Sequence, residues 1–209
     1  MSFLTGKKVV VMGVANKRSI AWGCAQALKE QGAEVIYTYQ NERMKKPLER
    51  LLEENEYTVE CDVANDESIA KAFETIKDYA GEIHGVVHAV AYANKDDLSG
   101  DILNISRDGY ALAQDISSYS LIAVTKYAKP LLAENAGIVT LTYLGSERAV
   151  PNYNMMGIAK AALESSVRYL AAELSPQKIR VNAISAGAIK TLAVTGVKDY
   201  QKLIQLSED

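Results

Sequence analysis

Cysteine, histidine and proline are scarce in this sequence of 209 residues, which holds two, two and four of them. Cys24, Cys61 and two histidines are too few for a disulfide framework or a zinc site, so we expect a metal-free protein. His88 lies within an apolar run, which favours a buried core residue over a catalyst. The remaining composition, 48% hydrophobic and 23% charged, is typical of a globular protein and argues against disorder or repeats.

Basic clusters and long apolar runs are also lacking. The formal net charge is −3, so the chain has no electrostatic footprint for nucleic acid. No apolar run approaches the roughly 20 residues that span a bilayer. The first stretch, MSFLTGKKVVVMG, does not have the charged and then apolar layout of a signal peptide. These absences predict a cytoplasmic protein that binds neither nucleic acid nor membrane.

Short apolar runs rich in β-branched residues alternate with longer helical patterns along the chain. Runs of Val, Ile and Ala without polar alternation are typical of parallel strands covered on both faces. Strict alternation of strand and helix predicts right-handed crossovers and a Rossmann-like, doubly wound α/β sheet in a single domain over residues 1–209. We expect strands at 7–12, 33–39, 57–62, 83–90, 137–143 and 178–185, and helices at 19–31, 42–54, 66–80, 107–134 and 152–174.

The first strand-to-helix loop, MGVANKRSIAWG, is a candidate site because ligands of such sheets bind beyond the carboxyl ends of the strands. Gly13 permits a tight turn, and free N–H groups at Ser19 and Ile20, together with the helix dipole, favour a pyrophosphate. Ser19 also fits the plain role of helix N-cap. The G-x-G-x-x-G fingerprint is absent, so the loop alone leaves dinucleotide binding open.

The end of the second strand, YTYQNER, carries residues that suit an adenosine ribose. Gln40 can hydrogen-bond a 2′-hydroxyl, or it is an ordinary polar surface residue. Glu42 disfavours a 2′-phosphate, although Arg43 and Lys45 weaken that argument. We therefore favour NADH as the cofactor over NADPH.

The end of the third strand, CDVAND, suits an adenine ring. Asp62 can accept a hydrogen bond from the adenine amino group while Val63 packs on the ring. The alternative role for an acid at a strand end is to cap the next helix, and that role fits Asp66 better than Asp62.

A tyrosine and a lysine stand seven residues apart in YNMMGIAKAALE, which starts at Tyr153. Seven residues are nearly two helical turns, so Tyr153 and Lys160 share one face, roughly 10 Å apart along the axis. A phenol has a pKa near 10 and is a hydrogen-bond donor at neutral pH, and a nearby cation stabilises its phenolate form. Lys160 could instead be a solvated surface charge, but the small and apolar residues around it favour a functional position.

Five stretches in this order resemble the enoyl-[acyl-carrier-protein] reductases of bacterial fatty-acid synthesis, a divergent branch of the short-chain dehydrogenase/reductases: MGVANKRSIAWG, HAVAYA, QDISSYS, LTYLGSERAVPNYNMMGIAKA and RVNAISAGAIKTLA. The similarity extends over essentially the whole chain. Short-chain enzymes usually carry Tyr and Lys four residues apart, whereas a separation of seven, with Tyr143 ten residues upstream, matches the enoyl reductases. The resemblance implies that NADH reduces the trans-2 double bond of an enoyl thioester on acyl-carrier protein.

The resemblance also implies roles for single residues. Tyr153 matches the tyrosine that donates a hydrogen bond to the thioester carbonyl, and Lys160 matches the lysine that binds the nicotinamide ribose. Tyr143 matches the upstream tyrosine, as a proton donor or as a wall of the pocket, and Ala93 falls at a backbone contact to substrate. The matches to cofactor contacts are Gly13, Ser19, Ile20, Gln40, Asp62, Val63, Val90, Lys160, Ile189, Lys190, Thr191, Leu192 and Ala193.

The C-terminal stretch KDYQKLIQLSED stops where relatives usually continue into another helix and a final strand, so we expect that end of the family fold to be missing. Lys198 and Lys202 lie four residues apart on a predicted short helix. They could dock the acidic acyl-carrier protein, or they are ordinary solvated charges. The family implies a homotetramer, and the helices predicted at 107–134 and 152–174 are apolar on several sides, which favours subunit contacts.

Two other functions stay open. A ketoreductase or alcohol dehydrogenase of the same superfamily would usually need a serine beside its tyrosine. Tyr143 stands at the upstream position that such a serine would occupy, although Ser146 lies close. A nucleotide-binding or regulatory subunit without catalysis is suggested only by the short C-terminus.

Overall fold

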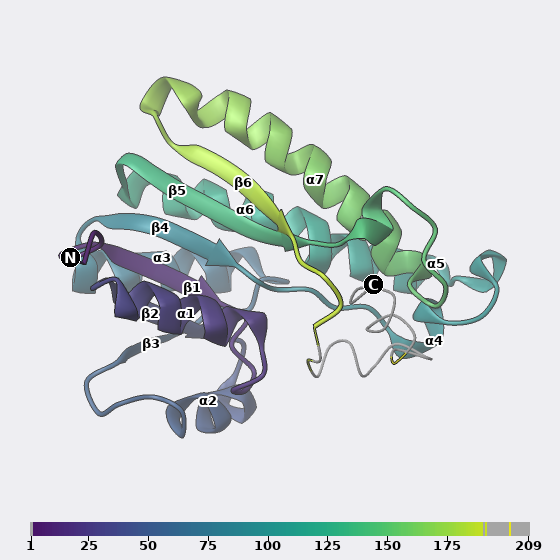
Figure 1. Cartoon of the computed structure of the whole chain (residues 1–209), viewed down its shortest axis with the longest axis horizontal. Coiled ribbons are helices and arrows are strands. Elements are labelled where there is room, and N and C mark those ends of the chain that lie inside the picture. The colour runs from purple at the N-terminus through teal and green to yellow at the C-terminus, as the bar shows by residue number, and fades with distance from the viewer. Residues whose placement is uncertain (1, 190, 192–200, 202–209) are drawn as a thin grey trace.

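Six parallel strands form one sheet in the computed structural model, which describes residues 2–189, 191 and 201. Figure 1 shows the strands side by side in the order β3-β2-β1-β4-β5-β6, and each neighbouring pair is parallel. This order is that of the Rossmann fold, so the predicted fold class is confirmed. The strands are β1 (Lys8–Met12), β2 (Glu34–Tyr39), β3 (Tyr57–Glu60), β4 (Ile83–His88), β5 (Leu132–Thr142) and β6 (Arg180–Ser185).

Helices cover both faces of the sheet because side chains alternate between the faces along each strand. Val9 and Val11 pack with α1 and α2 on one face, whereas Val10 and Met12 pack with α3, α6 and α7 on the other. In Figure 1, α1 lies in front of the sheet, and α3 and α6 lie behind it. The helices are α1 (Ile20–Glu30), α2 (Glu42–Glu49), α3 (Asp66–Ala80), α4 (Lys95–Leu98), α5 (Arg107–Gln114), α6 (Ser120–Ala128) and α7 (Asn154–Leu174).

The single helix predicted at 107–134 is wrong. After α5 the chain forms a π-helical turn, η2 (Asp115–Tyr119), before α6 begins. The helix ends at Ala128 and passes into a 3₁₀ turn that contains Pro130, a residue that has no N–H to continue an α-helix. β5 then starts at Leu132 instead of residue 137. The pairing of β5 with β4 has a shift in register between Ile83 and Gly85 of β4.

The cap of α3 is Asn65 and not Asp66. The Asn65 side chain accepts hydrogen bonds from the N–H groups of Glu67 and Ser68 at 2.9 and 3.1 Å. Asp66 is the first helical residue, where its negative charge suits the helix dipole. The predicted helix at 42–54 is also shorter than expected, because α2 ends at Glu49.

His88 is a buried core residue, as the sequence predicted. Its ring nitrogens lie 3.1 Å from Thr140 Oγ1 and 2.8 Å from Ser120 Oγ. Burial, together with the nearby charge of Lys160, lowers the pKa of His88 to about 3, so the ring is neutral at physiological pH. In the part of the chain that the structure describes, no helix combines the length and the apolar character needed to cross a membrane.

Candidate active site

A cavity of about 860 Å³ lies at the carboxyl ends of the strands, where ligands of this fold bind. It is lined by residues that follow β1, β2, β3, β4 and β5 and by the start of α7. The predicted site residues among its walls are Gly13, Ser19, Ile20, Gln40, Asp62, Val63, Val90, Ala93, Tyr143, Tyr153, Lys160 and Thr191. The fold therefore brings together positions that are spread over most of the sequence.

Some predicted residues are not placed in this wall. Ile189 is half exposed and is not one of the residues that line the cavity. Lys190, Leu192 and Ala193 lie outside the described residues, and so do the two proposed docking lysines, Lys198 and Lys202.

The loop after β1 has the close backbone approach that a dinucleotide site needs. Gly13 has a φ of +94°, and a Cβ at this position would lie 2.1 Å from the carbonyl oxygen of Ala89, so only glycine fits. Ser19 precedes α1, but its hydroxyl donates to the carbonyl oxygen of Asn16 at 2.6 Å and does not cap the helix. With Ser19 and Ile20 in the wall, the N-terminus of α1 faces the cavity and fits a pyrophosphate.

Gln40 and Asp62 lie next to each other at the far end of the cavity. Gln40 Nε2 donates to Asp62 Oδ1 at 3.4 Å, and the same oxygen accepts from the N–H of Ala64 at 3.1 Å. The N–H of Asp62 donates to Ser68 Oγ at 2.9 Å, which ties the loop to α3. The two side chains therefore form one polar edge, which fits an adenosine group.

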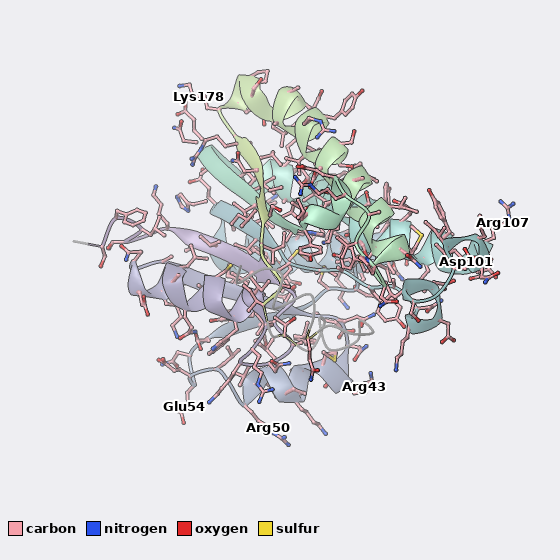
Figure 2. The ribbon with its side chains drawn as sticks, turned by 45° about the vertical axis from the view of Figure 1, so that its right-hand side comes forward. Arg43, Arg50, Glu54, Asp101, Arg107 and Lys178 are labelled. Carbon is pink, nitrogen blue, oxygen red and sulfur yellow. The ribbon has the colours of Figure 1, made fainter. Side chains whose placement is uncertain are left out.

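Two cations lie near this edge: Lys45 is paired with carboxylates, and Arg43 faces outward. Lys45 Nζ lies 3.6 Å from a carboxylate oxygen of Glu42 and 4.0 Å from one of Glu49. Arg43 is exposed, and Figure 2 shows it at the outer edge of the molecule together with Arg50 and Glu54. Neither Arg43 nor Lys45 lines the cavity, so this edge suits a ribose hydroxyl better than a 2′-phosphate.

Tyr143 and Tyr153 meet at the other end of the cavity. Tyr143 directly follows β5, and Tyr153 directly precedes α7. Their ring centroids are 4.9 Å apart with an interplanar angle of 73°, an edge-to-face contact. Burial raises the pKa of both phenols, and for Tyr153 the nearby Tyr143 adds to the effect. Both side chains are therefore neutral hydrogen-bond donors at physiological pH.

Lys160 is a buried cation and not a solvated surface lysine. Its side chain lines the cavity, only 7% of the residue is exposed, and Nζ donates to the carbonyl oxygen of Leu141 at 2.8 Å. Burial lowers its pKa from 10.5 to about 8, although the negative charge of Glu164 opposes this shift. The lysine is thus largely protonated at pH 7, with N–H groups left to donate into the cavity.

Comparisons with known proteins agree with this geometry. A family profile described as Enoyl-(Acyl carrier protein) reductase matches residues 13–209. The chain is 71% identical to the enoyl-[acyl-carrier-protein] reductase [NADH] FabI of Enterococcus faecalis, over 99% of this chain and 83% of that protein. It is 52% identical to the enoyl-[acyl-carrier-protein] reductase [NADH] FabI of Bacillus subtilis, over 99% of this chain and 81% of that protein.

A solved structure supports the same conclusion. The Bacillus cereus enoyl-acyl carrier protein reductase, in a complex with NADP⁺ and indole naphthyridinone, superposes with a TM-score of 0.94. The two sequences are 51% identical, and the match covers 99% of this chain and 82% of that one. The chain belongs to the enoyl-[acyl-carrier-protein] reductase family. The predicted family and enzyme class are confirmed.

Ser117 supports this reductase site and was not predicted from the sequence. Ser117, in the π-helical turn η2, is fully buried, and its hydroxyl accepts from the N–H of Tyr92 at 2.9 Å and donates to the carbonyl oxygen of Tyr92 at 2.8 Å. One hydroxyl thus fixes the backbone segment that carries Tyr92 and Ala93 into the cavity wall. The only signal in the sequence was the polar run QDISSYS inside an otherwise helical pattern.

Proposed function

We propose that this reductase saturates the trans-2 double bond of an enoyl thioester carried by acyl-carrier protein and uses NADH as the reductant. The observation that carries the proposal is the meeting of Tyr143, Tyr153 and the buried Lys160 in one cavity that has a dinucleotide-type loop at Gly13. The relatives from Enterococcus faecalis and Bacillus subtilis are named for this substrate class and for NADH, which supports both parts of the proposal.

The residues that would hold NADH follow the length of the cavity. Gly13 and the N-terminus of α1 bind the pyrophosphate, and Gln40 and Asp62 bind the adenosine. Lys160 donates to the nicotinamide ribose hydroxyls from its buried position. The remaining proposed cofactor contacts are Ser19, Ile20, Val63, Val90 and residues 189–193, of which Thr191 lines the cavity. NADH, when bound, supplies the hydride that adds to the β-carbon.

Tyr153 stabilises the enolate that forms when hydride reaches the β-carbon. Its hydroxyl donates a hydrogen bond to the thioester carbonyl oxygen, on which negative charge develops. The raised pKa keeps the phenol protonated, and a fixed donor in a partly dry site is worth more than one in water. Tyr143 and the backbone of Ala93 position the enoyl group, and the enolate then takes a proton from solvent water at its α-carbon.

The test of this proposal is NADH consumption with a crotonyl thioester. We expect Tyr153→Phe to lower kcat about 100-fold with little change in NADH affinity, because only a transition-state contact is lost. Lys160→Ala should weaken NADH binding. Tyr169→Phe is the matched control, since this exposed tyrosine lies on the same helix away from the cavity. Undiminished turnover in Tyr153→Phe would remove the proposed role.

Carbonyl reduction is the competing activity, and the position of Ser146 disfavours it. The Ser146 hydroxyl donates to Glu164 Oε1 at 2.5 Å, and Ser146 is not one of the residues that line the cavity. A serine engaged in this way has no proton to offer a carbonyl group beside Tyr153. Turnover of a ketone substrate without turnover of an enoyl thioester would nevertheless favour the competing activity.

The docking of acyl-carrier protein is proposed for Lys198 and Lys202, whose positive charges complement an acidic partner. Exchange of both lysines for glutamate should raise KM for the carrier-bound substrate and leave KM for a coenzyme A thioester unchanged. Equal effects on both substrates would contradict a docking role.

The assembly is proposed to be a homotetramer. Large apolar side chains are exposed on three successive elements: Tyr110 on α5, Tyr119 on η2 and Ile122 on α6. Their burial between subunits would stabilise an oligomer. Sedimentation equilibrium at micromolar concentration measures the mass, and a monomer would contradict the proposal.

A further inference from the structure

A carboxylate on α7 joins the helix to the end of β5, beside the cavity but outside its wall. Glu164 lies one turn after Lys160, and its Oε1 accepts hydrogen bonds from Thr142 Oγ1 at 2.6 Å and from Ser146 Oγ at 2.5 Å. Such lengths are typical of hydroxyl donors to an ionised carboxylate, which are stronger than bonds between neutral groups. Glu164 is not among the cavity-lining residues, so it does not act by touching a ligand there.

The two hydroxyls stand on either side of Tyr143. Thr142 is the last residue of β5, and Ser146 ends the 3₁₀ turn η4 (Leu144–Ser146). The N–H of Ser146 also donates to the carbonyl oxygen of Tyr143 at 2.9 Å, which closes the turn. One carboxylate therefore fixes the chain before and after the tyrosine.

The same turn packs against α7 through two glycines, which is an independent constraint. A Cβ on Gly157 would lie 2.7 Å from the carbonyl oxygen of Gly145, and a Cβ on Gly145 would lie 2.5 Å from Cδ1 of Tyr153. No space therefore separates the turn, the helix and the Tyr153 ring. A shift of the turn away from Glu164 would change the edge-to-face contact between Tyr143 and Tyr153.

We propose that Glu164 is a positioning residue, whose carboxylate fixes the turn after β5 so that Tyr143 stays edge-on against Tyr153. The proposal rests on the function proposed above for the two tyrosines. Lys160 binds the backbone carbonyl oxygen of Leu141, and Glu164 binds the side-chain hydroxyl of the next residue, Thr142. Successive turns of α7 thus orient successive residues at the end of β5.

Three variants separate the effect of the hydrogen-bond acceptor on Glu164 from the effect of its negative charge. Glu164→Ala removes the acceptor, Glu164→Gln keeps an oxygen that accepts both hydroxyls, and Ser146→Ala removes one donor while the charge stays. The charge of Glu164 raises the pKa of Lys160, which is about 8 in the wild type, so the two Glu164 variants lower it further. The assays are therefore run at pH 6.5, and Ser146→Ala, which keeps the charge, is compared at the same pH. Glu173→Ala is the matched control, because Glu173 is an exposed carboxylate on the same helix.

We expect Glu164→Ala to lower kcat for a crotonyl thioester about tenfold, with the Kd for NADH changed less than about twofold. Glu164→Gln should recover kcat to within about threefold, Ser146→Ala should fall between the two, and Glu173→Ala should match the wild type. Equal losses in Glu164→Gln and Glu164→Ala, or full activity in Glu164→Ala, would overturn the proposal. If Glu164→Ala does not fold, Ser146→Ala carries the test, and wild-type kcat in that variant overturns the proposal.

Two further measurements test the positioning role separately. The first distinguishes it from a general effect on stability, and the second does not depend on the proposed enoyl reductase activity. In a Tyr143→Ala background, Glu164→Ala should add less than about a twofold loss, because its effect acts through Tyr143; losses that multiply would overturn the proposal. The near-ultraviolet circular dichroism of the tyrosines requires no substrate. It should change in Glu164→Ala and not in Glu164→Gln, even if the wild type turned over no enoyl thioester; an unchanged spectrum in Glu164→Ala overturns the proposal.

Discussion

Exchange of Lys160 for methionine should separate the stability of this protein from its cofactor binding. The lysine is buried and carries a charge at pH 7, and burial lowers its pKa from 10.5 to about 8. Each pKa unit corresponds to about 1.4 kcal/mol, so the buried charge costs the folded state about 3 kcal/mol at neutral pH. Methionine has a similar length, fills the same space and carries no charge.

The gain from removing the charge is opposed by one lost hydrogen bond. Lys160 Nζ donates to the carbonyl oxygen of Leu141 at 2.8 Å, and methionine has no donor to replace it. A buried carbonyl without a partner costs about 1–3 kcal/mol. The net effect of Lys160→Met at pH 7 is therefore between about zero and 2 kcal/mol of added stability, whereas the affinity for NADH should fall.

The dependence on pH has a defined sign. The folded-state pKa of Lys160 lies below its value in the unfolded chain, so the unfolded chain binds more protons between pH 8 and 10.5. The stability of the wild type relative to Lys160→Met should therefore rise by about 3 kcal/mol across that window. The advantage of the variant is complete below about pH 8 and disappears toward pH 10.5.

Urea unfolding of both proteins at pH 7, 8, 9 and 10, together with NADH titration at pH 7, measures these effects. Other groups titrate equally in both proteins and cancel in the difference. A difference in stability that stays constant with pH would refute the argument that burial of the charge is costly. A loss of more than about 3 kcal/mol in the variant at pH 7 would refute it as well. Unchanged NADH affinity would refute the role of the lysine in cofactor binding.

Two other substitutions test the walls of the cavity. Ser117→Ala leaves the N–H and the carbonyl of Tyr92 without their shared partner. We expect the free energy of unfolding in urea to fall by about 1–3 kcal/mol and the KM for the enoyl thioester to rise. An unchanged KM would contradict this expectation. Gly157→Ala would stabilise an ordinary helix by about 0.5–1 kcal/mol, but here the new Cβ meets the carbonyl oxygen of Gly145. We expect a lower Tm and a lower kcat, and a raised Tm would show that the turn moves freely.

The fold was largely predictable because the strands are continuous apolar runs between helical patterns. The main error, one helix at 107–134, arose because YALAQDISSYSLIAVTKYA contains neither glycine nor proline to interrupt a helical pattern. The π-helical turn at 115–119 changes the helical geometry without any breaker in the sequence, and tertiary contacts such as that of Ser117 accompany it. Pro130 was the one local signal for the early end of the helix, and it was outweighed by the apolar residues around it.

The site was predictable where the fold itself dictates the location. Carboxyl ends of parallel strands share one edge, so the loops at Gly13, Gln40 and Asp62 had to converge once the sheet was correct. Ser117 and Glu164 could not be found in this way. Their partners are a backbone 25 residues away and two hydroxyls 22 and 18 residues away, and no spacing rule links such groups before the chain is folded.

The separation of seven between Tyr153 and Lys160 follows from the packing of the turn after β5. Position 157, four residues after the tyrosine, is where other short-chain enzymes usually carry the lysine. Here it is a glycine against the carbonyl oxygen of Gly145, and a lysine there would collide with the backbone. One turn further along α7, Lys160 reaches β5 and donates to the carbonyl oxygen of Leu141 at 2.8 Å. The close packing of the turn that carries Tyr143 on α7 thus excludes a lysine four residues after Tyr153, and the lysine that contacts β5 stands one turn later.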